Sequence, residues 1–326
     1  MRYIDLHCDT LMLHMSRKNT GDLYSNKIGS VDFKRLREGA AVAQFFAIYI
    51  FPENEFAHLE IEPSSTFEYV KRAAKYLHNN LNEYKAVAGL ATNGEELEDN
   101  EKENRVSAFL TIENGEPVNG KMENIKYFYE LGVRLITLTW NYENCFGFPN
   151  STNYEKMQLG LKPFGKEAVE YMNELGIIID VSHLSDGGFY DVLEISKKPV
   201  MASHSNARAL TNHPRNLTDD MIKRLADSGG VSGLNFASDF LKLGEKLTGA
   251  RLSSMIAHLD YMKDKGGEEF PALGSDLDGI DQNGLEICDS TKFGILFDGL
   301  KSAGWSERQI EKVAYKNAKR VINEVM

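Results

Sequence analysis

The sequence predicts an α/β protein with the fold of a (β/α)8, TIM-like barrel, formed by residues 1–326 as a single domain. Three observations lead to this prediction. Short apolar segments recur along the chain, and segments with apolar residues at helical spacing lie between most of them. Alternating strands and helices imply right-handed crossovers and a parallel sheet, and eight strand candidates suggest a closed barrel. A length of 326 residues suits one barrel, and no linker or repeat indicates a second domain.

The strand candidates are spread over the whole chain. The first is the segment 4–10, close to the start. The second, 41–50, is almost continuously apolar, as a strand buried on both faces of a parallel sheet requires. The other six barrel strands are expected at residues 107–113, 135–140, 177–183, 200–204, 231–236 and 272–278. One more short strand is expected at 86–90.

Helices are expected between these strands. In the second half of 52–82, apolar residues recur at helical spacing behind the cap candidates Ser64 and Ser65. The other helix candidates are residues 32–39, 122–131, 165–175, 219–228, 252–265 and 306–325. The last of them should close the barrel or cover its bottom. A loop is expected at 16–30, and the acidic segment 93–104 is expected to face water.

The composition favours a small-molecule partner. Aspartate and glutamate number 48 against 37 lysines and arginines, a net charge of −11, whereas a nucleic-acid-binding surface needs a basic stripe. Cys8, Cys145 and Cys288 form no C-x-x-C pair, so neither a disulfide framework nor a zinc knuckle is expected. No apolar stretch is long enough to span a bilayer, and the N-terminus lacks a signal-peptide pattern. We therefore expect a cytoplasmic protein without a membrane or nucleic-acid partner.

Histidines and carboxylates fall at the ends of the predicted strands. His7 and Asp9 share one face of the first strand, because side chains two residues apart in a strand point the same way. The third, fifth, sixth and eighth strands end at or near Glu113, His183, His204 and Asp276. Since the C-terminal ends of barrel strands meet at one mouth, these six side chains should converge. Any one of them could instead be a loop-entry or helix-cap residue, but six independent coincidences are a poor explanation.

The donor set predicts a binuclear metal site. One tetrahedral ion uses fewer ligands than the set formed by His7, Asp9, Glu113, His183 and His204. Two ions would use them all, with His7 and Asp9 on one, His183 and His204 on the other, and Glu113 bridging. Nitrogen and oxygen donors without thiolate favour zinc, with manganese or cobalt as alternatives. Two such ions can hold a hydroxide nucleophile between them near neutral pH, which is the chemistry of hydrolysis.

Two further residues complete the predicted site. Asp276 would carry the proton from the attacking water to the leaving group, with Asp278 in the same Gly-Ser-Asp-Leu-Asp-Gly segment as the alternative. Arg215 lies in the loop after the sixth strand, and its guanidinium suits bidentate binding of a substrate carboxylate. A surface salt bridge is the competing explanation for Arg215.

Seven ordered segments carry a resemblance to a known family: residues 5–10, 111–115, 135–139, 180–183, 202–208, 213–216 and 274–279. On these segments, which cover essentially the whole chain, it resembles the membrane (renal) dipeptidases and their bacterial relatives, zinc peptidase family M19, within the amidohydrolase-type barrels. The resemblance implies a binuclear zinc dipeptidase with the five ligands above and Glu113 bridging. It also implies acid–base catalysis by Asp276, binding of the C-terminal carboxylate by Arg215, and tolerance of a D-residue at that end. A soluble form is expected, and a homodimer is favoured.

One position departs from that family. Better-known members have a histidine directly after the Leu-Thr-Leu-Thr segment, where this chain has Trp140. That histidine is credited with polarising the scissile carbonyl, whereas tryptophan offers a single N–H donor. Trp140 is therefore expected either to donate to the substrate, with Asn141 or Asn144 assisting, or to shape the substrate pocket.

Two other functions fit the same residues. A barrel mouth changes chemistry through its loops, so the site could act on another small carboxylate-bearing amide, lactone or ester. The missing family histidine also leaves a non-catalytic metal-binding protein as a third interpretation. Arg215 and the bridging Glu113 favour the dipeptidase over both.

Overall fold

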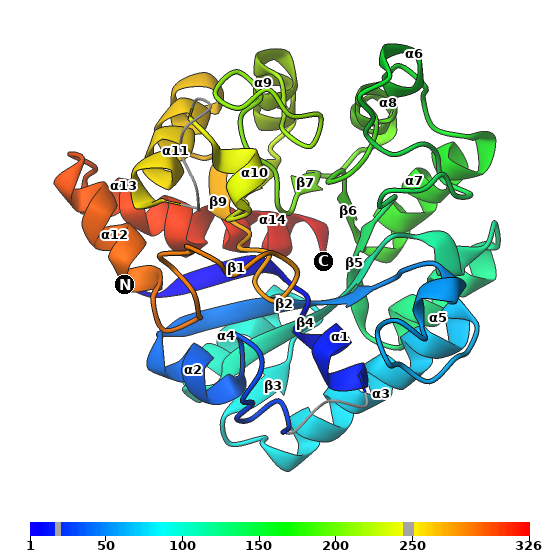
Figure 1. Ribbon diagram of the computed structural model, residues 1–326, viewed down its shortest axis with the longest axis horizontal. Helices are drawn as coiled ribbons and strands as arrows, with labels where there is room; N and C mark the ends of the chain where they lie inside the picture. The colour runs from blue at the N-terminus through cyan, green and yellow to red at the C-terminus, as the bar shows by residue number, and fades with distance from the viewer. Residues whose placement is uncertain (17–20, 244–250) are drawn as a thin grey trace.

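The computed structural model describes residues 1–16, 21–243 and 251–326 (Figure 1). Its centre is a nearly closed barrel of eight parallel strands, joined in the order β1-β2-β4-β5-β6-β7-β8-β9. These strands are β1 (Tyr3–Cys8), β2 (Ala41–Tyr49), β4 (Val106–Glu113), β5 (Val133–Thr137), β6 (Ile178–Asp180), β7 (Met201–Ala202), β8 (Val231–Leu234) and β9 (Pro271–Leu273). The predicted (β/α)8 fold is confirmed, and Figure 1 shows the helices arranged around the strands.

Two details of the strands differ from a plain eight-stranded pattern. β3 (Ala88–Leu90) pairs with β4 outside the barrel order, which confirms the extra short strand. β6, β7 and β9 are shorter than predicted, because the backbone leaves the strand conformation before His183, His204 and Asp276. His183 has φ of 68°, in the left-handed region, so it cannot continue a strand.

The barrel closes where the segment after β9 meets the end of β1. The backbone N–H of Asp9 donates to the carbonyl of Leu277 at 3.0 Å, and the N–H of Asp276 donates to the carbonyl of His7 at 3.1 Å. These two bonds bring residues from opposite ends of the chain together. As a result, Asp276 lies beside His7 and Asp9.

The described helices are α1 (Thr10–Met15), α2 (Phe33–Glu38), α3 (Thr66–Glu83), α4 (Gly94–Lys102), α5 (Met122–Glu130), α6 (Tyr154–Met157), α7 (Pro163–Leu175), α8 (Asp186–Ile195), α9 (Asp219–Asp227), α10 (Ser238–Leu241), α11 (Leu252–Gly266), α12 (Phe293–Ser302), α13 (Glu307–Glu311) and α14 (Asn317–Val325). Short 3-10 turns span Glu53–Glu55 and Glu116–Val118, and a π turn, Lys312–Lys316, joins α13 to α14. No described helix is both long and apolar enough to cross a membrane.

All the helices expected from the sequence are present. Ser65, rather than Ser64, caps α3, since its side chain accepts a hydrogen bond from the N–H of Glu68 at 3.3 Å. The sequence did not predict α4, which forms within the acidic segment 93–104, capped by Asn93 and anchored by the buried Leu97. It also missed α1, α6, α8, α10 and α12. Within the expected loop 16–30, residues 17–20 lie outside the described part of the chain.

The C-terminal helices cover the end of the barrel opposite the strand C-termini. In Figure 1, α14 lies in red near the centre of the view. One apolar cluster joins the inner residues of the strands to this helix: Ile4, Leu6, Phe45, Phe109, Leu135, Ile178, Met201, Val231, Ala272, Ala318, Val321, Ile322 and Val325. The covering of the barrel bottom predicted from the sequence is confirmed.

Candidate metal centre and substrate pocket

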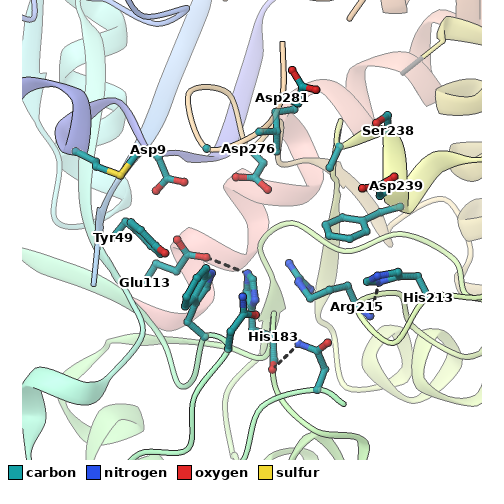
Figure 2. A pocket seen from close by; sticks show the side chains of 18 of the residues that line it. Asp9, Tyr49, Glu113, His183, His213, Arg215, Ser238, Asp239, Asp276 and Asp281 are labelled. Atoms are coloured by element: carbon teal, nitrogen blue, oxygen red, sulfur yellow. Dashed lines mark hydrogen bonds and ion pairs between the residues drawn. The ribbon is translucent and has the colours of Figure 1, made fainter. Parts of the chain in front are cut away.

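The strand ends surround a cavity of about 570 Å³ at the mouth of the barrel. It is lined by Asp9, Met12, Tyr49, Leu59, Glu113, Trp140, Asn141, Asn150, His183, His213, Arg215, Ala237, Ser238, Asp239, Phe240, Asp276, Gly279, Ile280 and Asp281. His7 and His204, which are 1% and 0% exposed, are packed against these residues. Figure 2 shows Asp9, Glu113 and Asp276 at one side of the cavity, with Arg215 and His213 at the other.

Glu113, the last residue of β4, lies at the centre of the polar cluster. Its Oε1 atom is 2.9 Å from Nε2 of His183 and 3.5 Å from Nε2 of His204. Its Oε2 atom is 3.6 Å from Nε2 of His7. The two oxygens of one buried carboxylate therefore face different histidines, which is the arrangement that a bridging ligand requires.

His7 faces two more carboxylates. Its Nε2 atom lies 3.7 Å from Oδ1 of Asp9 and 3.8 Å from Oδ1 of Asp276. The structure thus brings together all the side chains that the sequence predicted to converge, although β1, β4, β6, β7 and β9 are far apart in the chain. Gly279 permits the close approach, because a Cβ there would collide with the carboxylates of Asp9 and Asp276.

The residues present fit a divalent metal. Several buried polar atoms have no hydrogen-bond partner in the described structure, namely both ring nitrogens of His7, Oδ1 of Asp9 and Nδ1 of His183. Unpaired polar atoms are costly in a protein interior, and a cation would satisfy those that face the cluster. Donor atoms within 4.8 Å of one another form two groups: His7, Glu113 and His204, and His7, Asp9 and Asp276. Imidazole and carboxylate donors suit zinc, and also manganese or cobalt.

Crowding of three carboxylates perturbs their ionisation. Burial, together with repulsion from Glu113, raises the pKa of Asp9 to about 7. Burial also raises the pKa of Asp276 to about 6, with attraction from His7 opposing it. Burial alone would raise the pKa of Glu113, but His7 and the hydrogen bond from His183 outweigh it and hold this pKa well below its usual range. A bound cation would favour the ionised form of all three.

The two histidines beside Glu113 Oε1 are kept neutral. Burial, followed by repulsion from Arg215, lowers the pKa of His183 to about 4. Burial, followed by repulsion from His7, lowers the pKa of His204 well below its usual value. Neutral imidazole is the form that binds a metal, so no proton has to be removed from these rings near pH 7.

Asp276, and not Asp278, faces the cavity. Its Oδ2 atom accepts a hydrogen bond from Nδ2 of Asn235 at 2.9 Å, while Oδ1 faces His7. Asp278 is occupied elsewhere, since Thr10 Oγ1 and the Ser30 N–H each donate to its carboxylate at 2.6 Å. Asp276 has φ of 62°, a backbone strain of the kind often found at functional sites.

Arg215 is buried at the other side of the cavity, with 6% of its surface exposed. Its guanidinium donates to the His204 carbonyl at 3.0 Å and to Ser205 Oγ at 3.2 Å, and it lies 5.5 Å from the centre of the Phe240 ring. Nε has no acceptor, and no carboxylate of the described residues lies within ion-pairing distance. The alternative of a surface salt bridge is therefore wrong. A buried cation with no carboxylate partner among the described residues suits an anionic substrate group.

Trp140 and its neighbours form one wall of the cavity. The Trp140 ring packs edge-on against Tyr49 at 5.0 Å, and its centre is 6.3 Å from that of His183. No described residue accepts a hydrogen bond from its indole N–H. Asn141 is exposed and lines the cavity. The expected help from Asn144 is wrong, because its buried amide donates to the Leu138 carbonyl and to Oδ1 of Asn114.

Sequence reasoning missed much of the pocket, including three residues that contact the predicted site: Tyr49, Asn150 and Asn235. Tyr49 ends β2 directly beside Glu113 in the strand register, and Figure 2 shows its hydroxyl directed toward that carboxylate. The strand-end rule that found Glu113 would also have found Tyr49. Asn150 donates to the His183 carbonyl at 3.1 Å, and Asn235 orients Asp276. Asn150 and Asn235 carry no sequence signal, since their roles depend on loop contacts.

A parallel barrel with a buried cluster of histidines and carboxylates at its mouth is the architecture of a metal-dependent hydrolase. The model of the membrane dipeptidase family, peptidase family M19, matches residues 1–326, and the chain belongs to this family. Membership implies a metal-dependent hydrolase of the dipeptidase type.

Individual relatives agree with this assignment. The chain is 29% identical over 306 residues to an uncharacterized dipeptidase of Schizosaccharomyces pombe, covering 90% of this chain and 72% of the relative. It is also 29% identical over 317 residues to the dipeptidase aclJ of Aspergillus oryzae, covering 96% and 74%. Among solved structures, an M19 metallo peptidase named dipeptidase AC aligns with a TM-score of 0.86 at 27% identity, over 100% of this chain and 98% of that one. A metallo peptidase from Rhodobacter sphaeroides, bound to a phosphinate mimic of L-Ala-D-Ala, aligns with a TM-score of 0.85 at 27% identity, over 100% and 99%.

Proposed function

We propose that this protein hydrolyses the peptide bond of dipeptides, both L,L and L,D, with two zinc ions at the mouth of the barrel. His7 and Asp9 would hold one ion, His183 and His204 the other, and Glu113 would bridge them. The observation that carries this proposal is the position of Glu113, whose two oxygens face His7 on one side and the other histidine pair on the other. Manganese or cobalt would suit the same donors.

When bound, the two ions supply a hydroxide nucleophile near neutral pH. Asp276 is the proton carrier in this proposal. Its carboxylate faces the cavity beside His7, and the hydrogen bond from Asn235 leaves Oδ1 directed toward the cluster. From there it can take the proton of the attacking water and pass it to the leaving amine.

Arg215 would bind the carboxylate of the dipeptide. Its Nε, which has no acceptor among the described residues, and its place across the cavity from Glu113 and Asp276 would set the direction of the substrate (Figure 2). The N-terminal residue would then lie toward Trp140 and Asn141, which also line the cavity. A cavity of about 570 Å³ has the size of a small-molecule site and suits a dipeptide.

The stereochemical part of the proposal has a separate support. The structurally similar metallo peptidase from Rhodobacter sphaeroides is liganded with a mimic of L-Ala-D-Ala, a dipeptide with a D-residue at its carboxyl end. We extend this preference to the present chain.

We also propose that residues 1–326 act as a single catalytic domain, because helices from both ends of the chain pack on one barrel. The homodimer and the cytoplasmic location stay predictions.

The test combines metal analysis with turnover. Protein prepared with excess zinc should bind two ions per chain and release amino acids from a panel of L,L and L,D dipeptides. Protein treated with a chelator should be inactive until metal is returned. Absence of bound metal would refute the proposal. Two bound ions without peptide turnover would instead favour another small carboxylate-bearing amide, lactone or ester as substrate.

A further inference from the structure

Asp180, Ser182 and Ser203 lie in the same two segments as His183 and His204, but the proposed function gives them no role. All three are buried, with 0%, 1% and 0% of their surfaces exposed. Ser182 accepts a hydrogen bond from the main-chain N–H of His204, and Ser203 contacts Nδ1, the ring nitrogen that does not face Glu113. Asp180 contacts both serines. Both ring nitrogens of His204 therefore have polar contacts, Nε2 with Glu113 and Nδ1 with Ser203.

The Asp180 carboxylate, at the end of β6, accepts four hydrogen bonds. The backbone N–H groups of Ser182 and Ser203 donate to Oδ1 at 2.9 and 2.8 Å. The hydroxyls of Thr137 and Ser203 donate to Oδ2 at 2.6 and 2.5 Å. A carboxylate has no hydrogen to give, so the single hydrogen of the Ser203 hydroxyl is committed to Asp180.

The hydrogen bond from Ser203 to Asp180 determines which ring nitrogen of His204 carries the hydrogen. Ser203 Oγ lies 2.7 Å from Nδ1 of His204 and, having given its own hydrogen to Asp180, can only accept. Nδ1 therefore carries the hydrogen, and in the neutral ring Nε2 carries the lone pair. That lone pair faces Glu113 Oε1 at 3.5 Å and Nε2 of His183 at 2.9 Å.

We propose that Asp180 and Ser203 form a hydrogen-bond relay that sets the tautomer of His204, so that Nε2 is ready to bind a metal ion. Ser203 is a positioning residue, and the inference rests on the metal site of the proposed function. The relay is specific to one histidine, because Nδ1 of His7 and Nδ1 of His183 have no hydrogen-bond partner in the described chain. Outer partners of this kind change metal affinity by about 10–100-fold.

The first test measures Zn²⁺ affinity of the full chain by competition with a chromophoric chelator. Ser203→Ala should weaken Zn²⁺ binding by about 10–100-fold while all five proposed ligands remain. Ser232→Ala is the matched control. Ser232 on β8 is also fully buried, and its hydroxyl donates to the Ser205 carbonyl at 2.8 Å, away from any imidazole. The control should bind Zn²⁺ like the wild type.

The second test reverses the direction of the hydrogen bonds from Asp180 to His204. In Asp180→Asn the amide donates to Ser203, whose hydroxyl then turns to Nδ1 of His204 and moves the ring hydrogen to Nε2. Nitrogen NMR of metal-free protein should show Nδ1 protonated in the wild type and Nε2 protonated in this variant. Zn²⁺ affinity should fall at least as far as in Ser203→Ala. Because the substitution keeps the volume, it also serves if Ser203→Ala does not fold.

The outcomes separate the relay from the proposed function. Wild-type Zn²⁺ affinity in both variants, with unchanged His204 signals, would refute the relay even if dipeptides are hydrolysed. A loss of affinity and a changed tautomer, in a wild-type protein that hydrolyses no dipeptide, would uphold the relay and refute the dipeptidase. Absence of Zn²⁺ binding by the wild type would refute both.

Discussion

The two ends of the barrel are made of opposite residue types. At the N-terminal end, inward-facing residues such as Ile4, Phe109 and Val231 pack against Val321 and Ile322 of α14. At the C-terminal end, the same strands lead into a cluster of histidines and carboxylates, and several of its buried atoms have no hydrogen-bond partner among the described residues. The N-terminal end stabilises the fold by burying apolar surface. The C-terminal end buries unpaired polar groups, which costs folding free energy.

The difference indicates a division of roles along the barrel axis. In TIM barrels, chemistry sits at the C-terminal ends of the strands and the other end serves stability. Left-handed backbone conformations do not follow this division. Asn114, His183 and Asp276, at the mouth, have φ between 62° and 77°, but Ala40 and Asn104, just before β2 and β4 at the other end, have φ of 63° and 57°. Because the residue types do follow it, substitutions at the mouth should affect metal binding and turnover, whereas substitutions at the bottom should affect stability.

The largest effect is expected for Glu113→Gln. The substitution removes the charge that faces both histidine groups, so both ions should be lost and dipeptide turnover should fall to background. Metal analysis and a turnover assay on the purified variant measure this. Retention of two ions with wild-type turnover would show that Glu113 is not the bridging ligand.

Asp276→Asn tests the proton carrier. Loss of general acid–base catalysis should lower kcat by about 10²–10⁴-fold with the metal content unchanged. Asp278→Asn is the matched control, since Asp278 bonds to Thr10 and Ser30 outside the cavity and should affect thermal stability instead. An equal loss of kcat in both variants would contradict the assignment.

Ile322→Ala probes the opposite end. Removing this fully buried side chain should cost about 2–5 kcal/mol of unfolding free energy, through lost burial and the cavity left behind. Urea denaturation measures the loss. At temperatures well below the unfolding transition, kcat and metal content should match the wild type. A fall in kcat in the folded variant would mean that the two ends are coupled.

His258 connects α11 to the loop that leads to Arg215. Its Nδ1 accepts from the Ala207 N–H at 3.2 Å, and burial lowers its pKa to about 4. A lowered histidine pKa gives stability that is complete above about pH 6.5 and is lost as the pH falls toward about 4. The loss should amount to at most roughly 3–4 kcal/mol. Urea denaturation at pH 7 and pH 5 should show a smaller pH dependence for His258→Gln than for the wild type; an equal dependence would exclude His258 as its source.

The smallest effect concerns Arg215. Arg215→Ala removes a charged hydrogen-bond donor, which should cost roughly 1.5–3 kcal/mol of binding free energy. KM for free-acid dipeptides should therefore rise by about 10–100-fold. KM for the corresponding dipeptide amides should change far less. Arg208, in the same loop, is different, because its guanidinium already binds the Asp186 carboxylate at 2.7 and 2.8 Å. An equal rise of KM for acids and amides would remove the assigned role of Arg215.

The sequence by itself determined the barrel and the set of polar residues at its mouth. Apolar segments alternating with helical segments predict parallel strands, and parallel strands of a barrel bring their C-terminal ends together. Placing His7, Glu113 and His204 near one another therefore needed only their positions at the ends of those segments. This inference is robust because it depends on chain connectivity and not on the details of any loop.

Tertiary structure decided what each polar group can do. Asp276 faces the cavity and Asp278 does not, although both have positive φ and lie two residues apart. Among the described residues, Arg215 has no carboxylate within ion-pairing distance. Asn144 donates to Leu138 and Asn114, and Ser203 orders the hydrogen on His204. These outcomes depend on hydrogen bonds between loops that are distant in sequence. Such bonds are set by the packed backbone, so no periodicity or spacing in the chain could have revealed them.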